Sequence, residues 1–124
     1  MRGDGAYGID LEELDGSAAL VRVRGELDLA SAPSLKWSLT DLLGSGSRRI
    51  VLDLSQVSFI DSTALSVLVG LQRALQPDGL IAIAAATAEV QNILELTGLD
   101  ATFEMFPSLD DALSRVRGSA AAAG

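Results

Sequence analysis

Hydrophobic residues along this chain form short runs that are typical of strands and longer periodic segments that are typical of helices. The runs at 50–54 and 80–85 are short, and the first is rich in β-branched residues, so both predict buried strands. Residues 19–25 end in a Val/Arg alternation and residues 9–14 partly alternate, which predicts an antiparallel pair with one solvent-facing side. The dipeptide Asp15-Gly16 between them is typical of tight hairpin turns.

Four segments place apolar residues at the three- and four-residue spacing of an amphipathic helix. They are expected from Ser31 and Pro33 to Leu43, from Ser62 to about Gln76, from Thr87 to Gly98, and from Pro107 and Ser108 to Gly118. The predicted buried stripes are Leu35, Leu39, Leu42 and Leu43 in the first, Val90, Ile93, Leu94 and Thr97 in the third, and Leu109, Ala112, Leu113 and Val116 in the fourth. Phe103 is expected in a short strand or extended segment between the third and fourth helices.

Strands that alternate with helices imply crossover connections. The predicted fold class is therefore α/β, with a small mixed sheet that is antiparallel in the N-terminal hairpin and otherwise mostly parallel, and with about four helices. A chain of 124 residues suits a single domain, which we place at 9–117. Residues 1–8 hold three glycines and no pattern and are expected to be a flexible leader, and 118–124 a disordered tail of small residues.

Composition narrows the classes of function. The formal charge of −8 disfavours direct binding to nucleic acids or anionic membranes. It favours a protein partner with a basic patch, although acidity can also serve solubility alone. No apolar run is long enough to span a bilayer and no signal peptide is visible, so a cytoplasmic location is expected.

The chemistry available to the chain argues against an enzyme. It has no His and no Cys, so neither a Ser-His-Asp triad nor thiolate chemistry is possible, and no phosphate-binding P-loop motif is present. No cofactor is expected. Asp28, Asp53 and Asp61 should lie near the carboxyl ends of strands and could hold Mg²⁺ if they converge. Capping and turn hydrogen bonds are the favoured alternative for these carboxylates.

The most informative stretch is 57–70, where a polar group precedes a periodic apolar segment. Asp, Ser and Thr at this point predict a helix start with Ser62 at or next to the N-cap, close to the positive end of the helix dipole. A phosphate on that hydroxyl would meet backbone donors, but a Ser at a helix start can also be only a cap.

One face of this predicted helix carries Ser62, Ser66, Gly70 and Arg73, and the first three are small. The remaining faces are more apolar than a single core-facing stripe requires, so the helix is either wholly buried or a docking surface. In the helix before it, Trp37 points away from the apolar stripe. It either covers the end of a neighbouring strand or anchors a partner.

The stretch resembles the STAS domain (sulfate transporter and anti-sigma factor antagonist), as found in bacterial anti-sigma factor antagonists. The resemblance rests on Asp53-Leu54-Ser55, on Phe59-Ile60 and on Asp61-Ser62-Thr63-Ala64-Leu65. The segments 25–33 and 93–100 are similar to the start of the family's first helix and to its third helix, so most of 9–117 is covered. Two departures are Ala64 and Ser66, where the family often has Gly.

The resemblance implies a phosphorylation-gated binding module. Ser62 would accept a phosphate, and the unphosphorylated protein would bind an anti-sigma factor that is itself the serine kinase, releasing a sigma factor. A cognate phosphatase would reset it. The residues expected to bind the partner are Asp28, Asp61, Thr63, Leu65, Ser66, Val69, Gly70 and Arg73. The alternative is a non-enzymatic STAS subunit of a membrane lipid or anion transport complex, in which the same face docks permanently and Ser62 only packs or caps.

Overall fold

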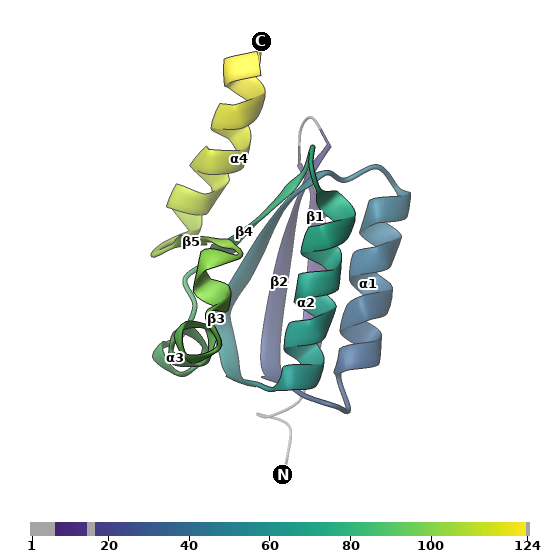
Figure 1. Cartoon of the computed structure of the whole chain (residues 1–124). Coiled ribbons are helices and arrows are strands. Elements are labelled where there is room, and N and C mark those ends of the chain that lie inside the picture. The colour runs from purple at the N-terminus through teal and green to yellow at the C-terminus, as the bar shows by residue number, and fades with distance from the viewer. Residues whose placement is uncertain (1–6, 15–16, 124) are drawn as a thin grey trace.

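A five-stranded sheet with helices on both faces forms the core of this protein (Figure 1). The computed structural model describes residues 7–14 and 17–123, with side chains up to Arg117. The strands are β1 (Gly8–Glu13), β2 (Ala18–Leu27), β3 (Arg49–Ile60), β4 (Leu80–Ala84) and β5 (Glu104–Phe106). The helices are α1 (Ala32–Gly44), α2 (Ser62–Leu75), α3 (Ala88–Thr97), the 3₁₀ turn η2 (Leu99–Ala101) and α4 (Leu109–Ala123).

The strands lie in the sheet in chain order, β1-β2-β3-β4-β5. β1 pairs antiparallel with β2, and every later neighbour pairs in parallel. This confirms the predicted mixed sheet, because each parallel neighbour is reached through a helical crossover. The predicted turn at Asp15-Gly16 lies outside the described residues.

Two apolar layers hold the helices on the sheet. The larger one joins α1, α2 and α3 to one face through side chains that include Leu39, Leu68 and Leu94. The smaller one joins α4 to the opposite face through Ala112 and Val116. The predicted stripes are confirmed apart from Thr97, which is exposed because it lies at the last turn of α3.

The helix ends follow local capping rules. Thr87 caps α3, since its Oγ1 accepts a hydrogen bond from the Val90 amide at 3.4 Å. Gly98 ends the same helix with a left-handed φ of 76°, a conformation that glycine adopts without steric cost. Both assignments agree with the sequence prediction.

The α4 face of the sheet remains open over β1 and the second half of β2, where it carries charged side chains. Arg24 pairs with Asp10 at 2.9 Å, and Arg22 lies 3.9 Å from Asp53. Gly8 stands opposite Arg24, and a Cβ there would overlap the guanidinium, so glycine lets Arg24 lie across β1. This is the solvent-facing side that the Val/Arg alternation predicts.

The boundaries that differ most from the prediction are the end of β3, the start of β1 and the end of α4. β3 continues past residue 54 to Ile60, because the second halves of β2 and β3 pair with each other across register shifts near Gly25, which has a φ of 92°. β1 begins at Gly8, inside the expected leader. α4 passes Gly118 and runs to Ala123, since the alanines that follow are strong helix formers. Among the described residues, no helix is long and apolar enough to cross a bilayer.

Candidate functional site

Ser62 is the first residue of α2 and is exposed. The N-cap is Asp61, whose Oδ1 accepts a hydrogen bond from the Ala64 amide at 3.1 Å. The capping role therefore belongs to Asp61, and the Ser62 hydroxyl is left facing solvent. The first amides of a helix have no acceptor within it, and the dipole is positive there, so a phosphate on Ser62 would lie in a favourable field.

Asp61 also joins α2 to the loop that leads into α1. Its Oδ2 accepts a hydrogen bond from the Leu29 amide at 3.1 Å, and its own amide donates to the Leu27 carbonyl at 2.9 Å. The loop and the helix start are thus held as one unit, because a single carboxylate bonds to both.

The loop itself is closed by Asp28 and Ser31. The Asp28 Oδ1 accepts from the amides of Ala30 and Ser31 at 3.0 and 3.2 Å. The Ser31 hydroxyl donates to the Glu26 carbonyl at 2.8 Å and accepts from the Asp28 amide at 2.9 Å. These bonds fix the loop beside Ser62, so Asp28 and Asp61 give this end of the molecule a negative charge.

A hollow of about 230 Å³ lies beside this loop and is lined in part by Tyr7, Glu26 and Asp28. Burial raises the pKa of the Tyr7 hydroxyl above its ordinary value of 10.0. Tyr7 is therefore neutral at physiological pH and adds no charge to this end.

The three aspartates do not converge on a metal site. Asp53 lies inside β3 on the α4 face, where its Oδ1 accepts from the Ser55 amide at 3.0 Å, so its predicted place at a strand end is wrong. The prediction failed because β3 runs on to Ile60. Within the described ranges, no three His, Cys, Asp or Glu side chains are grouped so that they could hold a metal. The carboxylates make the capping and turn bonds that were the favoured alternative.

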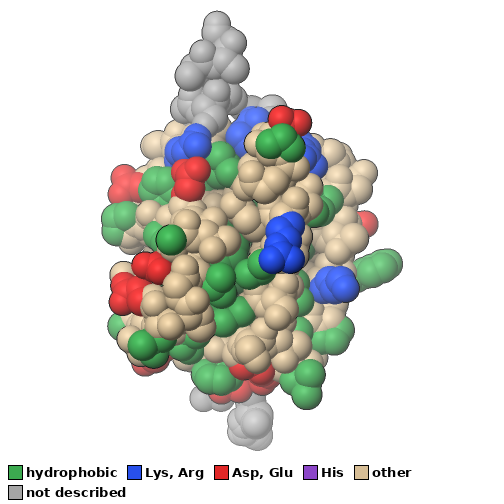
Figure 2. All heavy atoms as spheres, in the orientation of Figure 1, with side chains coloured by type: hydrophobic (Ala, Val, Ile, Leu, Met, Phe, Trp, Pro, Cys, Tyr) green, Lys and Arg blue, Asp and Glu red, His purple; other side chains and the backbone are tan. Residues whose placement is uncertain are grey.

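The outer face of α2 is open to solvent, so the helix is not wholly buried. Ser62, Ser66, Gly70 and Arg73 are all exposed along it. The Ser66 hydroxyl donates to the Ser62 carbonyl at 2.9 Å. Figure 2 shows the surface over α2 as mostly uncharged, with basic side chains standing on it and acidic side chains at its lower end.

A groove lies on each side of this face. The α2–α3 groove, of about 440 Å³, is lined by Ser62, Leu65, Ser66, Val69, Gly70, Arg73, Thr97 and Leu99. The α1–α2 groove, of about 310 Å³, is lined by Lys36, Leu39, Thr40, Leu43, Ser66, Val67, Gly70, Leu71 and Ala74. Ser66 and Gly70 line both grooves, so they form the low ridge between them.

Most of the residues predicted to bind the partner lie close together in the structure. Six of the nine candidate residues line the α2–α3 groove, namely Ser62, Leu65, Ser66, Val69, Gly70 and Arg73. Asp28 and Asp61 lie at its Ser62 end, and Thr63 is half-buried next to Ser62. Ala64 is fully buried, so its methyl group faces the core and not the groove, whereas Ser66 is on the surface.

The sequence alone did not predict the surface positions of three residues near the site. Leu29 is 72% exposed in the loop bonded to Asp61, and Phe59 is 44% exposed at the end of β3. Nothing in the neighbouring sequence indicates that Leu29 and Phe59 are exposed, because an isolated Leu or Phe in an apolar segment is typical of a core. Lys36, from α1, lines the α1–α2 groove, and only the packing of two helices could reveal it.

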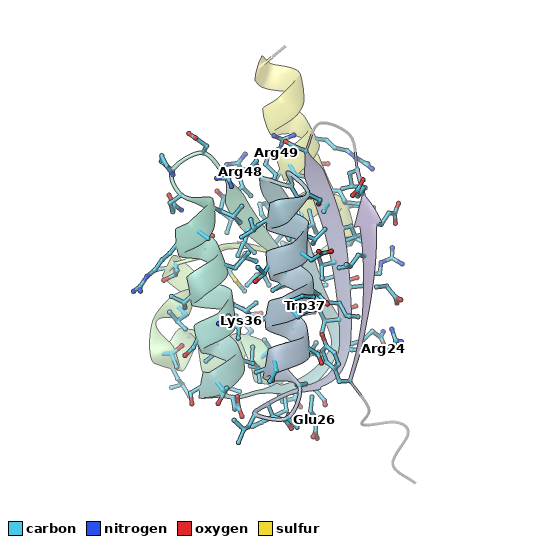
Figure 3. All side chains as sticks on the ribbon, turned by 90° about the vertical axis from the view of Figure 1, so that its right-hand side faces the viewer. Arg24, Glu26, Lys36, Trp37, Arg48 and Arg49 are labelled. Atoms are coloured by element: carbon cyan, nitrogen blue, oxygen red, sulfur yellow. The ribbon has the colours of Figure 1, made fainter. Side chains whose placement is uncertain are left out.

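Trp37 is 75% exposed and projects from α1 on the side away from α2 (Figure 3). It does not cover the end of a strand, so that prediction is wrong: α1 turns the indole outward from the sheet. The other expectation, an anchor for a partner, remains a prediction.

Comparison with known proteins identifies similar chains. The family model described as STAS domain matches residues 9–112. The anti-sigma-F factor antagonist RsfB of Mycobacterium tuberculosis is 31% identical over 100 residues, which are 81% of this chain and 82% of RsfB. The crystal structure of an anti-sigma factor antagonist from Mycobacterium paratuberculosis is similar with a TM-score of 0.84 and 33% identity, covering 91% of this chain and 96% of that one.

A more distant structure shows the same fold. It is the Bacillus cell fate determinant SpoIIAA in the phosphorylated form, with a TM-score of 0.70 and 21% identity over 88% of this chain and 99% of that one. At this identity the similarity concerns the fold alone.

Proposed function

Because the chain belongs to the STAS domain family, we propose that it is an anti-sigma factor antagonist switched by phosphorylation of Ser62. In this proposal the unphosphorylated protein binds an anti-sigma factor with serine kinase activity and thereby releases a sigma factor. Phosphorylation of Ser62 ends the binding, and a phosphatase restores it. The observation that carries the proposal is the exposed Ser62 hydroxyl at the start of a helix whose outer face is open to solvent.

The size of the expected electrostatic effect suits a switch. A phosphate adds a charge of about −1.5 to −2 at neutral pH. It would stand next to Asp61, at an end of the molecule that also holds Asp28. An unpaired charge in an interface costs about 2–5 kcal/mol, which is a loss of affinity of about 30-fold to several thousand-fold.

The fold need not change for this switch to work. The N-terminus of α2 offers amides and a positive dipole, so it can accept the dianion locally. The phosphorylated SpoIIAA structure, which shares the fold, supports this view by analogy. In the proposed function the protein is the substrate of a kinase and performs no catalysis itself, since a chain without His or Cys lacks the usual nucleophile-activating groups.

The site assignment is tested by incubating the purified protein with its anti-sigma factor and ATP, followed by intact-mass and peptide analysis. We expect one phosphate on the wild-type chain, located on Ser62, and none on Ser62→Ala. Thr63→Ala and Ser66→Ala remove the neighbouring hydroxyl groups, and both variants should still carry the phosphate on Ser62. Stoichiometric labelling of Ser62→Ala would show that the acceptor is elsewhere.

The switch is tested by affinity capture from a lysate depleted of ATP. Wild type and Ser62→Ala should retain the anti-sigma factor, and Ser62→Glu should lose most of it because of the added charge. If the three variants instead retain a membrane transport ATPase equally, and no phosphate appears on Ser62, the alternative of a permanent STAS subunit is favoured.

A further inference from the structure

The two grooves that flank α2 differ in charge from the rest of the molecule. The chain has 17 acidic and 9 basic residues. Among the described residues, however, only two charged side chains line either groove, and both are basic: Lys36 and Arg73. α2 itself contains no acidic residue. Neither Lys36 nor Arg73 takes part in the salt bridges seen among the described residues. The surface of an acidic protein is therefore locally basic here.

The two cations stand on opposite sides of the ridge formed by Ser66 and Gly70. Lys36 lies on the side of α1 that faces α2, as Figure 3 shows, and lines the α1–α2 groove. Arg73 lines the α2–α3 groove. We call this surface, the ridge with its two grooves, the α2 saddle.

The shape of the α2 saddle suits a helix. The distance between packed helices is set by the side chains at their contact, and a Ser-Gly ridge permits a close approach. Side chains one turn apart on a crossing helix would then enter the two grooves, whose lining is largely apolar: Leu65 and Val69 on one side, Leu43 and Val67 on the other. A Cβ built on Gly70 would have no atom within 4 Å apart from the backbone of its own helix. No other part of the protein therefore covers the ridge at this point.

We propose that the α2 saddle binds an amphipathic helix of the anti-sigma factor, with apolar side chains in the two grooves and acidic side chains against Lys36 and Arg73. The inference rests on the proposed function and adds the chemistry of the partner segment. It also implies an orientation, because the Ser62 end of the same face is acidic, with Asp28 and Asp61. The partner should therefore be basic near Ser62 and acidic over the α2 saddle.

Charge reversal tests this pairing with the purified anti-sigma factor as the probe. Lys36→Glu and Arg73→Glu should each weaken binding by at least about tenfold, and their affinity should depend less on salt than that of the wild type. Arg117→Glu, an exposed arginine on α4 across the sheet, is the matched control for net charge and should bind like the wild type. Because Arg73 also lies at the C-terminal turn of α2, unfolding curves of each variant separate binding from stability.

The location is tested by photo-crosslinking residues placed at Thr40 and Thr97, one in each groove. We expect both to capture the same acidic, amphipathic segment of the anti-sigma factor. If the wild type binds but both charge reversals leave affinity unchanged, or if the captured segment is basic, the inference is wrong while the proposed function stands. Failure of the wild type to bind any anti-sigma factor overturns both. Crosslinking between two copies of this chain would assign the α2 saddle to a dimer and overturn the inference.

Discussion

At the scale of single residues, Gly70 lies in the middle of α2, where nothing in the fold requires a glycine. It has no left-handed backbone angle, and a Cβ would point into open space. Glycine in a helix interior costs about 0.5–1 kcal/mol relative to alanine. Without a Cβ, Gly70 permits the close approach of another chain that the α2 saddle proposal requires.

Replacing Gly70 by Ala should therefore have opposite effects on folding and binding. We expect the free energy of unfolding to rise by about 0.5–1 kcal/mol. Affinity for the anti-sigma factor should fall by about 5- to 150-fold, because an added methyl group in a close interface costs about 1–3 kcal/mol. Urea unfolding and isothermal titration calorimetry measure the two quantities.

Gly44→Ala is the control, since Gly44 is also helical, exposed and free of neighbours at its Cβ position, but ends α1 outside both grooves. It should leave the affinity unchanged. A Gly70→Ala variant that binds as tightly as the wild type would show that no partner backbone approaches this point.

At the scale of elements, one face of α2 packs against the sheet and the opposite face is exposed to solvent. Leu68 and Leu75 are fully buried against the sheet, while Ser66 and Gly70 face solvent. The helix is anchored by its inner face and by the Asp61 cap, so substitutions on the outer face can alter binding without unfolding the protein.

Leu68→Ala should thus destabilise the protein by about 2–5 kcal/mol, through lost burial and the cavity left behind. Leu96→Ala is the matched control, because Leu96 is 78% exposed on α3 and its loss should change the free energy of unfolding by less than about 0.5 kcal/mol. Chemical denaturation of both variants makes the comparison. Equal effects of the two substitutions would mean that the inner face of α2 does not carry the packing described above.

At the scale of the whole molecule, the site of the proposed switch lies apart from the core of the fold. The Ser62 hydroxyl lies on the surface at a helix N-terminus, whereas the apolar layers lie on the inner faces of the helices. In the proposed switch, a charge added at Ser62 would therefore act on a bound partner and leave the core untouched.

Phosphorylated and unphosphorylated forms should differ by less than about 1 kcal/mol in free energy of unfolding, since the helix dipole offsets repulsion from Asp61. Urea unfolding of both forms, with kinase-treated Ser62→Ala as the control, measures this. A large loss of stability on phosphorylation would point to a switch that works by unfolding.

The sequence by itself determined the class of fold and the position of the central serine. Alternation in β2, the apolar run in β3 and the Asp-Ser-Thr group at the start of α2 are local signals, because side-chain periodicity and capping depend on neighbours a few residues away. The shared face of Ser62, Ser66, Gly70 and Arg73 follows from helical geometry alone.

Only the tertiary structure decided what surrounds that face. The extension of β3 to Ile60 depends on pairing with β2, and the polar residues 55 and 56 concealed it from a local reading. Lys36 enters the α1–α2 groove, and Leu29 bonds to Asp61, through contacts between segments far apart in the chain. Periodicity reports which side of an element is buried, but which elements meet there depends on the energy of packing the whole chain.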